Sequence, residues 1–363
     1  MAVNGDQAWQ GLNPQVGAGS VQFGSLLRMS RSSPLHYVPY GDLATSPNVV
    51  ADGSPTDGTL LCLSHWPGIG SPTEFAADLS AEMAFLYLRA FDRHPAATAV
   101  SNNHFDQDGL VGVFALAAPD EALARRALLV EIARAGDFAA TPSRDAARVS
   151  MALSAYADPA RTPLGALPAD YEAGAALLYS EMLGRLTELC DHPDRSRDLW
   201  AEEDATLQAS EDALTSGRVK VEEWPDLDLA IVTVPEQAPN AGGHRFGGGW
   251  VHGLHPMAVH NATECGALLT QRGRHFEFAY RYESWVQFRT RSVRSRVDLS
   301  PLADQLNQEE ANGVWSADDV SALTPLLSLD STESSLAPER FASLVEAHLR
   351  TAPAAWDPYR VTC

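Results

Sequence analysis

The chain has 363 residues, enough for two domains, and its hydrophobic fraction of 45 % is ordinary for a globular protein. Its net charge of −21 and its single lysine, Lys220, exclude long nucleic-acid strands as expected partners, because binding them takes many basic contacts. No stretch has the roughly 18–20 apolar residues of a membrane helix, and residues 1–33 do not resemble a secretion signal. We therefore expect a cytoplasmic protein with a poorly ordered start.

The first half of the chain alternates predicted strands with predicted helices. Two short apolar runs end in polar residues, Asn48–Asp52 and Thr59–His65, and a third, Ala97–Val100, leads into a polar segment. Such runs, followed by turn residues, are typical of buried strands in a parallel sheet. Helical spacing of apolar residues predicts helices over 78–91, 110–116 and 121–135. We expect Asp78 or Ser80 to cap the first helix. The pattern predicts an α/β fold built on a parallel sheet.

The second half predicts a helical connector and a second, smaller α/β domain. Helices are expected at 171–189 and 199–214. The elements expected after them are a strand at 227–234, a glycine-rich loop at 242–250, a helix at 255–269, paired strands at 276–282 and 285–289, and a helix at 298–306. The expected divisions are a poorly ordered segment, a first domain, the connector and a second domain, at 1–33, 34–165, 166–217 and 218–363.

The cysteines do not suggest a structural metal or disulfide framework. Cys62, Cys190, Cys265 and Cys363 form no CxxC pair. We interpret them as reduced thiols of a protein in a reducing compartment.

One polar segment, residues 104–109 (HFDQDG), combines the ligands of a divalent-metal site. His104, Asp106 and Asp108 alternate along it, so an extended backbone would point their side chains to one side. Imidazole together with carboxylates suits Mn²⁺ or Mg²⁺. In open parallel sheets the working residues lie at the carboxyl ends of strands. Two other predicted strands end in Asp52 and His65. The alternatives are an Asx-rich turn that caps a helix, or a calcium-type loop.

This segment resembles the first motif of the DHH phosphoesterase family, a strand ending in HxDxDG and followed by a helix of small and apolar residues. Other segments are similar to the family's remaining motifs: the strand ending in Asp52, the run Leu63-Ser64-His65-Trp66-Pro67 with the helix after it, and Ala135-Gly136-Asp137-Phe138. Residues 285–292 and 297–303 resemble a strand and a helix of the family's substrate-binding domain.

Two features depart from the family pattern. The segments similar to the second and third motifs precede the one similar to the first. A circular permutation would explain this order, since a sheet can be re-cut in a loop while its strand ends stay together. In the third motif, Asp-His-His-Pro in the family, only the middle histidine is kept, as His65, and Ser64 and Trp66 stand beside it. The number of metals is therefore left open.

The resemblance implies a metal-dependent hydrolase, a phosphoesterase that binds Mn²⁺ or Mg²⁺. The ligands it implies are Asp52, His65, His104, Asp106, Asp108 and Asp137. The catalytic residues it implies are His104, Asp106 and His65: a water activated by the metal attacks phosphorus, and a histidine handles protons. The expected substrate is a small anionic molecule, either a phosphate ester or a nucleotide.

Arginines and histidines of the second domain are the candidates for substrate binding. Arg289 and Arg291 would share one face of a strand, and arginine forks match the geometry of phosphate. The alternative is a charged edge strand that discourages aggregation. His255 and His260 lie close in sequence to His252, and we interpret them as substrate contacts in a cleft between the domains. The alternatives are a zinc-like metal site and structural histidines.

Two other functions remain open. One is a metal-dependent hydrolase or lyase acting on a small molecule without phosphate. The other is a non-catalytic binding protein that keeps the fold. The chain contains no GxSxG elbow, Walker loop, dinucleotide fingerprint or HExxH sequence.

Overall fold

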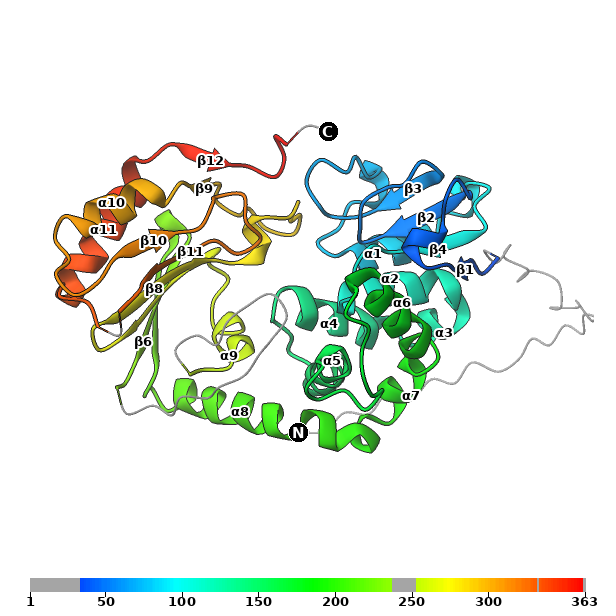
Figure 1. Cartoon of the computed structure of the whole chain (residues 1–363), viewed down its shortest axis with the longest axis horizontal. Helices are drawn as coiled ribbons and strands as arrows, with labels where there is room; N and C mark the ends of the chain where they lie inside the picture. The colour runs from blue at the N-terminus through cyan, green and yellow to red at the C-terminus, as the bar shows by residue number, and fades with distance from the viewer. Residues whose placement is uncertain (1–32, 237–252, 332, 362–363) are drawn as a thin grey trace, which may run out of the picture. The chain divides into compact units, whose positions relative to one another are not determined.

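The computed structural model describes residues 33–236, 253–331 and 333–361. Its strands form a four-stranded parallel sheet, a six-stranded mixed sheet and a two-stranded sheet, accompanied by helices, which confirms the predicted α/β class (Figure 1). The expected glycine-rich loop and all but the last residue of the expected poorly ordered segment lie outside the described residues. No helix among the described residues is long and apolar enough to cross a membrane.

The first sheet brings together the strands that were predicted in the first half of the chain. Its order is β1-β4-β2-β3, and each neighbouring pair is parallel. The strands are β1 (His36–Tyr37), β2 (Asn48–Ala51), β3 (Thr59–Leu63) and β4 (Ala99–Ser101). All residues of β2 are buried, as expected for a central strand of a parallel sheet. Because β4, β2 and β3 are neighbours, the polar residues after them meet at one edge.

Helices of the first half pack with this sheet into one hydrophobic core. They are α1 (Ser80–Tyr87), α2 (Gln107–Ala117), α3 (Pro119–Ala124), α4 (Arg126–Asp137) and α5 (Arg144–Ala157). Helix α2 is buried along almost its whole length. A Cβ added at Gly112 would lie 3.1 Å from the Ala51 Cβ, so the missing side chain lets α2 pack closely on β2.

A run of helices follows, in the region predicted as the connector. The helix expected at 171–189 is two helices, α6 (Tyr171–Met182) and α7 (Leu186–Asp191), and the helix expected at 199–214 is α8 (Arg197–Thr215). Helix α8 leads into the strands of the six-stranded sheet (Figure 1).

The second sheet has the order β10-β11-β8-β7-β6-β5, in which only the pair β6 and β7 is parallel. Its strands are β5 (Lys220–Trp224), β6 (Leu229–Val234), β7 (Ala267–Arg272), β8 (His275–Tyr280), β10 (Trp315–Ala317) and β11 (Leu326–Leu329). Helices α10 (Ser300–Asn307) and α11 (Pro338–Thr351) pack with it around Phe278 and Phe341 (Figure 1). Strands β9 (Arg296–Val297) and β12 (Ala354–Trp356) form the small sheet.

The prediction of a helix over 255–269 is wrong. Only α9 (Pro256–His260) is helical there, and β7 follows it. Residues of β7 pair with β6 on one side and with β8 on the other. Tertiary pairing on both sides therefore overrides the helical spacing of the apolar residues.

The prediction of paired strands at 276–282 and 285–289 is also wrong. Strand β8 pairs with β7 and β11, and residues 282–284 form a 3₁₀ turn. Three backbone N–H groups after this turn donate to the first half of the chain: Gln287 N to His65 O at 2.9 Å, and Arg289 N and Thr290 N to Asp78 Oδ1 at 2.6 and 2.9 Å. A segment whose N–H groups have these partners cannot form a ladder with β8.

Candidate metal centre

Three neighbouring strand ends build the centre. Asp52 follows β2, His65 lies two residues beyond β3, and His104 lies in the loop after β4. Asp52 has a φ of 56°, in the left-handed region that non-glycine residues rarely adopt. Aspartate is among the few residues that tolerate this conformation. A sparsely populated backbone conformation at a buried carboxylate is a common sign of a functional position.

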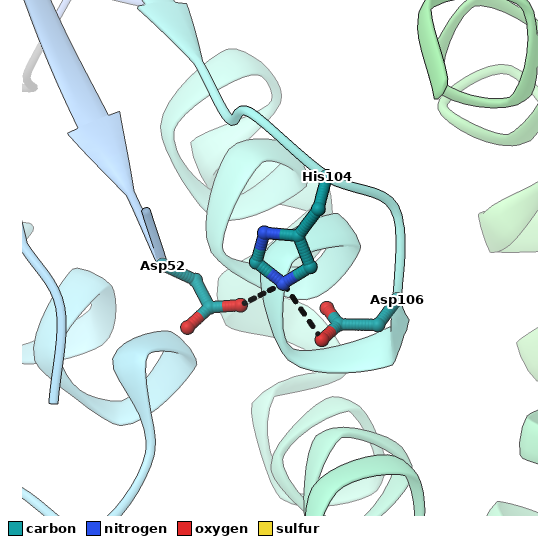
Figure 2. A group of neighbouring side chains, drawn as sticks. All are labelled: Asp52, His104 and Asp106. Carbon is teal, nitrogen blue, oxygen red and sulfur yellow. Dashed lines mark hydrogen bonds and ion pairs between the residues drawn. The ribbon is translucent and has the colours of Figure 1, made fainter. Parts of the chain in front are cut away.

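The first group of ligand atoms comes from Asp52, His104 and Asp106 (Figure 2). The Nε2 atom of His104 lies 3.2 Å from Asp52 Oδ2 and 2.9 Å from Asp106 Oδ2. The other oxygen of Asp106, Oδ1, accepts a hydrogen bond from Gly109 N at 2.8 Å and so caps α2. Asp106 therefore combines the two expected roles: Oδ1 caps α2, and Oδ2 remains in the group of ligand atoms.

The second group comes from Asp52, His65 and Asp108, and Asp137 adjoins it. The Nε2 atom of His65 lies 3.7 Å from Asp52 Oδ1, 4.0 Å from Asp108 Oδ2 and 3.4 Å from Asp137 Oδ2. Asp137 reaches this place from the last residue of α4. The structure thus brings all six residues that were predicted as metal ligands into one cluster, and Asp52 belongs to both groups.

The amino end of α1 holds two of the carboxylates in place. Asp108 accepts hydrogen bonds from Ser80 N at 2.8 Å and from Ala81 N at 2.9 Å, and the Ser80 hydroxyl donates to Asp52 Oδ1 at 2.8 Å. Sequence analysis proposed Ser80 only as a helix cap. The N-cap position of α1 is Leu79, which makes no side-chain cap bond. The role of Ser80 at the centre was missed, since an isolated serine carries no signal for it.

Burial and mutual repulsion strongly perturb these groups. Burial, followed by the charges of neighbouring aspartates, raises the pKa values of Asp108 and Asp137 well above the ordinary value. Burial also favours a raised pKa at Asp52, but hydrogen bonding and charge attraction from His104, with His65 and Ser80, outweigh it and lower that pKa. Burial lowers the pKa of His65. Without a bound cation, carboxylates this close together cannot all ionise, so the cluster shares protons among them.

The donor set fits a divalent cation. Asp52 Oδ2 and Asp137 Oδ2 are buried and face imidazole nitrogens, His104 Nε2 at 3.2 Å and His65 Nε2 at 3.4 Å. Their side chains are only 1 % and 4 % exposed. Buried charges normally have a partner or bind a metal. Carboxylate oxygens with imidazole nitrogens are ligands that Mn²⁺ accepts, and the oxygens alone suit Mg²⁺.

Aromatic rings line the cluster, and sequence analysis missed them. Trp66 stacks on His104, with ring centroids 5.1 Å apart. The Trp66 ring also lies edge-on to Trp285, with ring centroids 5.8 Å apart. Tyr282 lies edge-on to His65, and its hydroxyl is 3.5 Å from His65 Nε2. Burial, with the nearby carboxylates, raises the pKa of Tyr282 well above its usual value, so the hydroxyl stays protonated and can donate a hydrogen bond.

Gly109 provides a direct test of how tightly the centre is packed. A Cβ at this position would lie 2.1 Å from Asn102 Nδ2 and 2.6 Å from Tyr179 Oη. We expect Gly109→Ala to lower the free energy of unfolding by about 1–3 kcal/mol, because these buried side chains would have to move. Gly174→Ala in α6 is the control, since its Cβ would lie 3.6 Å from the Pro168 carbonyl oxygen, an ordinary van der Waals distance. Urea unfolding measures both, and equal stability of the two variants would contradict the expectation.

The predicted substrate-binding residues do not all lie together. His260 and Arg291 line a cavity of about 570 Å³, together with Thr290 and with Phe138, which follows Asp137. Arg289 is not among its lining residues, and its guanidinium lies over the Tyr359 ring. The shared strand face expected for Arg289 and Arg291 is absent, because residues 285–291 form no strand.

His255 has a different place from the one predicted. It is fully buried, accepts a hydrogen bond from Met257 N through Nδ1 at 3.1 Å, and so caps α9. Its Nε2 lies 3.3 Å from Glu203 Oε1. The structure therefore places His255 in the packing between α8 and α9, outside the lining of the cavity.

The cysteines Cys62, Cys190 and Cys265 are free and buried.

Comparison with known proteins gives a family and no function. No curated protein and no solved structure matches the chain. Residues 33–360 match a family model described as "Family of unknown function (DUF6687)". Because the match covers well over half of the chain, this protein belongs to the DUF6687 family.

Proposed function

We propose that this protein is a metal-dependent hydrolase that cleaves a small phosphate ester or a nucleotide. One observation carries the proposal: four carboxylates and two imidazoles from three strand ends, the first turn of α2 and the end of α4 converge in one largely buried cluster. Strongly perturbed groups concentrated at the carboxyl edge of a parallel sheet are typical of an active site.

The proposed cofactor is Mn²⁺ or Mg²⁺, held in two adjoining positions. One position would use Asp52, His104 and Asp106, and the other Asp52, His65 and Asp108, with Asp137 beside it. Asp52 Oδ2 faces His104, and Oδ1 faces His65, so a single carboxylate would serve both positions. Bound divalent ions act as Lewis acids and lower the pKa of water, which is the chemistry that hydrolysis of a phosphate ester needs.

The other side chains near the centre would orient the substrate. The Tyr282 hydroxyl is a hydrogen-bond donor beside His65. Arg291 and His260 line the adjacent cavity, where they can bind anionic oxygens. The cavity is linked to the centre through Phe138, whose carbonyl oxygen lies 2.8 Å from His260 Nδ1 and whose ring lies 6.2 Å from the His65 ring.

The resemblance to the DHH phosphoesterases supports the proposal. The segments similar to the first three motifs end at neighbouring strands, β4, β2 and β3, although they occur in a different order along the chain. At the altered third motif, Trp66 stacks on the His104 ring in place of supplying a ligand. Such stacking restricts the orientation of His104.

A non-phosphate substrate is the second candidate, and the lining of the cavity favours it. The charged side chains there include three arginines and three glutamates: Arg134, Arg281, Arg291, Glu223, Glu264 and Glu283. A balanced lining suits a polar or zwitterionic molecule as well as a phosphate ester. The reaction would then be a metal-dependent hydrolysis or elimination.

Asp106→Ala tests the proposed function. We expect the wild-type protein to retain Mn²⁺ after purification and to hydrolyse members of a phosphatase and phosphodiesterase panel. The variant should lose at least about 100-fold in activity, because even residues behind metal ligands change affinity or activity by 10–100-fold. Asp145→Ala, which removes a carboxylate that is 65 % exposed on α5, is the control and should leave activity unchanged.

Three results are decisive. Activity that survives Asp106→Ala would contradict the assignment of the centre. Metal binding without hydrolysis of any phosphate ester would favour the non-phosphate candidate. A protein that binds none of Mn²⁺, Mg²⁺, Zn²⁺ and Fe²⁺ would be a binding protein that keeps the fold, and the proposal would fail.

A further inference from the structure

Asp78 connects two parts of the chain that sequence analysis treated separately. It is 1 % exposed and lies just before α1. Its main-chain oxygen contacts His65 Nδ1 at 2.5 Å. Its carboxylate accepts hydrogen bonds from Arg289 N at 2.6 Å, Thr290 N at 2.9 Å and the Thr290 hydroxyl at 2.5 Å. A single residue therefore contacts both a histidine of the centre and a segment more than 200 positions away.

The carbonyl of Asp78 determines which nitrogen of His65 faces the carboxylates. A carbonyl oxygen only accepts hydrogen bonds, so the Nδ1 atom beside it must carry the proton and donate. The lone pair of a neutral imidazole then lies on Nε2, the atom directed at Asp52, Asp108 and Asp137. Metal-binding histidines are commonly oriented through their second nitrogen in this way.

The carboxylate of Asp78 holds the segment 282–291 (the docking segment) in place. This segment carries Tyr282, with its hydroxyl beside His65 Nε2, and it contributes Thr290 and Arg291 to the cavity. It is also tied to the strand end by the bond from Gln287 N to His65 O. Hydrogen bonds to a buried charged acceptor are among the stronger ones in proteins.

From this geometry we infer that Asp78 is a positioning residue that couples the centre to the docking segment. A cation bound to His65 would limit the motion of its ring, and through the hydrogen bond to the Asp78 carbonyl it would also limit the motion of Asp78. The Asp78 carboxylate would in turn limit the motion of Arg289 and Thr290. Coupling is reciprocal, so anchoring the docking segment would also favour the cation. The inference rests on the proposed metal-dependent function.

Hydrogen exchange of the full chain, with and without Mn²⁺, tests the coupling. In the wild-type protein we expect saturating Mn²⁺ to slow amide exchange in residues 286–291 by about tenfold or more, as the loss of one such hydrogen bond would predict. In Asp78→Ala the amides of Arg289 and Thr290, which bond to the Asp78 carboxylate, should exchange fast in both states. Asp78→Asn should restore part of the protection, since its amide oxygen can still accept from both backbone N–H groups.

A matched control separates this role from general stability. Glu310 also accepts a hydrogen bond from a backbone N–H, that of Ser335 at 2.7 Å, and one from a hydroxyl, that of Ser334 at 2.5 Å, in the region of β10. Glu310→Ala should leave the Mn²⁺ effect on residues 286–291 unchanged. If Asp78→Ala unfolds the chain, Thr290→Val removes only the hydroxyl bond and should weaken the protection, and Thr290→Ser should restore it.

The outcomes distinguish the inference from the proposed function. If calorimetry shows no Mn²⁺ binding by the wild-type protein, the proposed function and the metal coupling both fail. If Mn²⁺ binds, and Asp78→Ala keeps the wild-type exchange pattern, the inference is overturned while the proposed function stands. Equal loss of the Mn²⁺ effect in Glu310→Ala would also overturn it, because the effect would then follow stability alone.

Discussion

Replacing Asp52 by asparagine should lower Mn²⁺ affinity at least about 100-fold and abolish hydrolysis. Asp52 belongs to both groups of ligand atoms, so one substitution removes negative charge from both positions. Changes behind metal ligands already cost 10–100-fold, and a shared ligand should cost more. Calorimetric titration with Mn²⁺ measures the affinity, and the substrate panel measures the activity.

Asparagine is the right substitution because the backbone at residue 52 limits the choice. The φ of 56° disfavours most side chains, whereas asparagine tolerates the left-handed region. Its amide oxygen can still accept the hydrogen bond from Ser80 Oγ, at 2.8 Å in the wild-type protein. The variant should therefore fold, and circular dichroism is the check. A folded Asp52→Asn protein that binds Mn²⁺ as tightly as the wild type would contradict the shared role of this carboxylate.

The convergence of the centre could be predicted because it follows from local rules. Short apolar runs indicate parallel strands, and the residues after such strands gather at one edge of the sheet. Asp52, His65 and His104 were placed together on that basis alone. Asp137 depended on the family resemblance, since it ends a helix and no strand leads to it.

The docking segment could not be predicted because its partners are distant in sequence. Residues 285–289 were predicted as a strand, but the N–H groups of Gln287 and Arg289 bond to His65 and Asp78, more than 200 positions earlier. Nothing in the local pattern encodes such a partner. His255 was also misplaced because its partners could not be seen in the local sequence. Its neighbours in sequence suggested a substrate site, whereas its neighbours in space are Glu203 and the start of α9.

The metal-free protein should lose stability as the pH rises, and Mn²⁺ should prevent the loss. Asp108 and Asp137 have pKa values raised well above the ordinary 3.8, by burial and by their charged neighbours. The folded protein therefore keeps protons that the unfolded chain releases once the pH exceeds about 3.8. Stability from these groups is complete below that pH and is lost as the pH rises through their folded pKa values, by up to about 1.4 kcal/mol per pH unit for each proton.

The histidines determine the pH range in which the stability test can be interpreted. The pKa of His104 is raised well above 6.5, because the charges and hydrogen bonds of Asp106 and Asp52 outweigh the opposing effect of burial. The stability that His104 contributes to the protein therefore also decreases as the pH rises. Burial lowers the pKa of His65, which gives the opposite trend below about 6.5. Above pH 6.5 the contribution of His65 fades, because its imidazole becomes neutral in both states, and the raised pKa values of Asp108, Asp137 and His104 all predict decreasing stability.

Urea unfolding over this pH range, in EDTA and in excess Mn²⁺, measures the effect. A cation that replaces the shared protons binds more tightly as the pH rises, by about tenfold per pH unit for each proton displaced. The stabilisation by Mn²⁺ should therefore grow from pH 6.5 to 8.5. Asp137→Asn removes one titrating group from the cluster and should flatten the curve in EDTA, whereas Asp145→Asn should not. A metal-free stability that increases over this range would show that the carboxylates ionise freely, and a buried cluster poised to exchange protons for a cation would then be the wrong description of the centre.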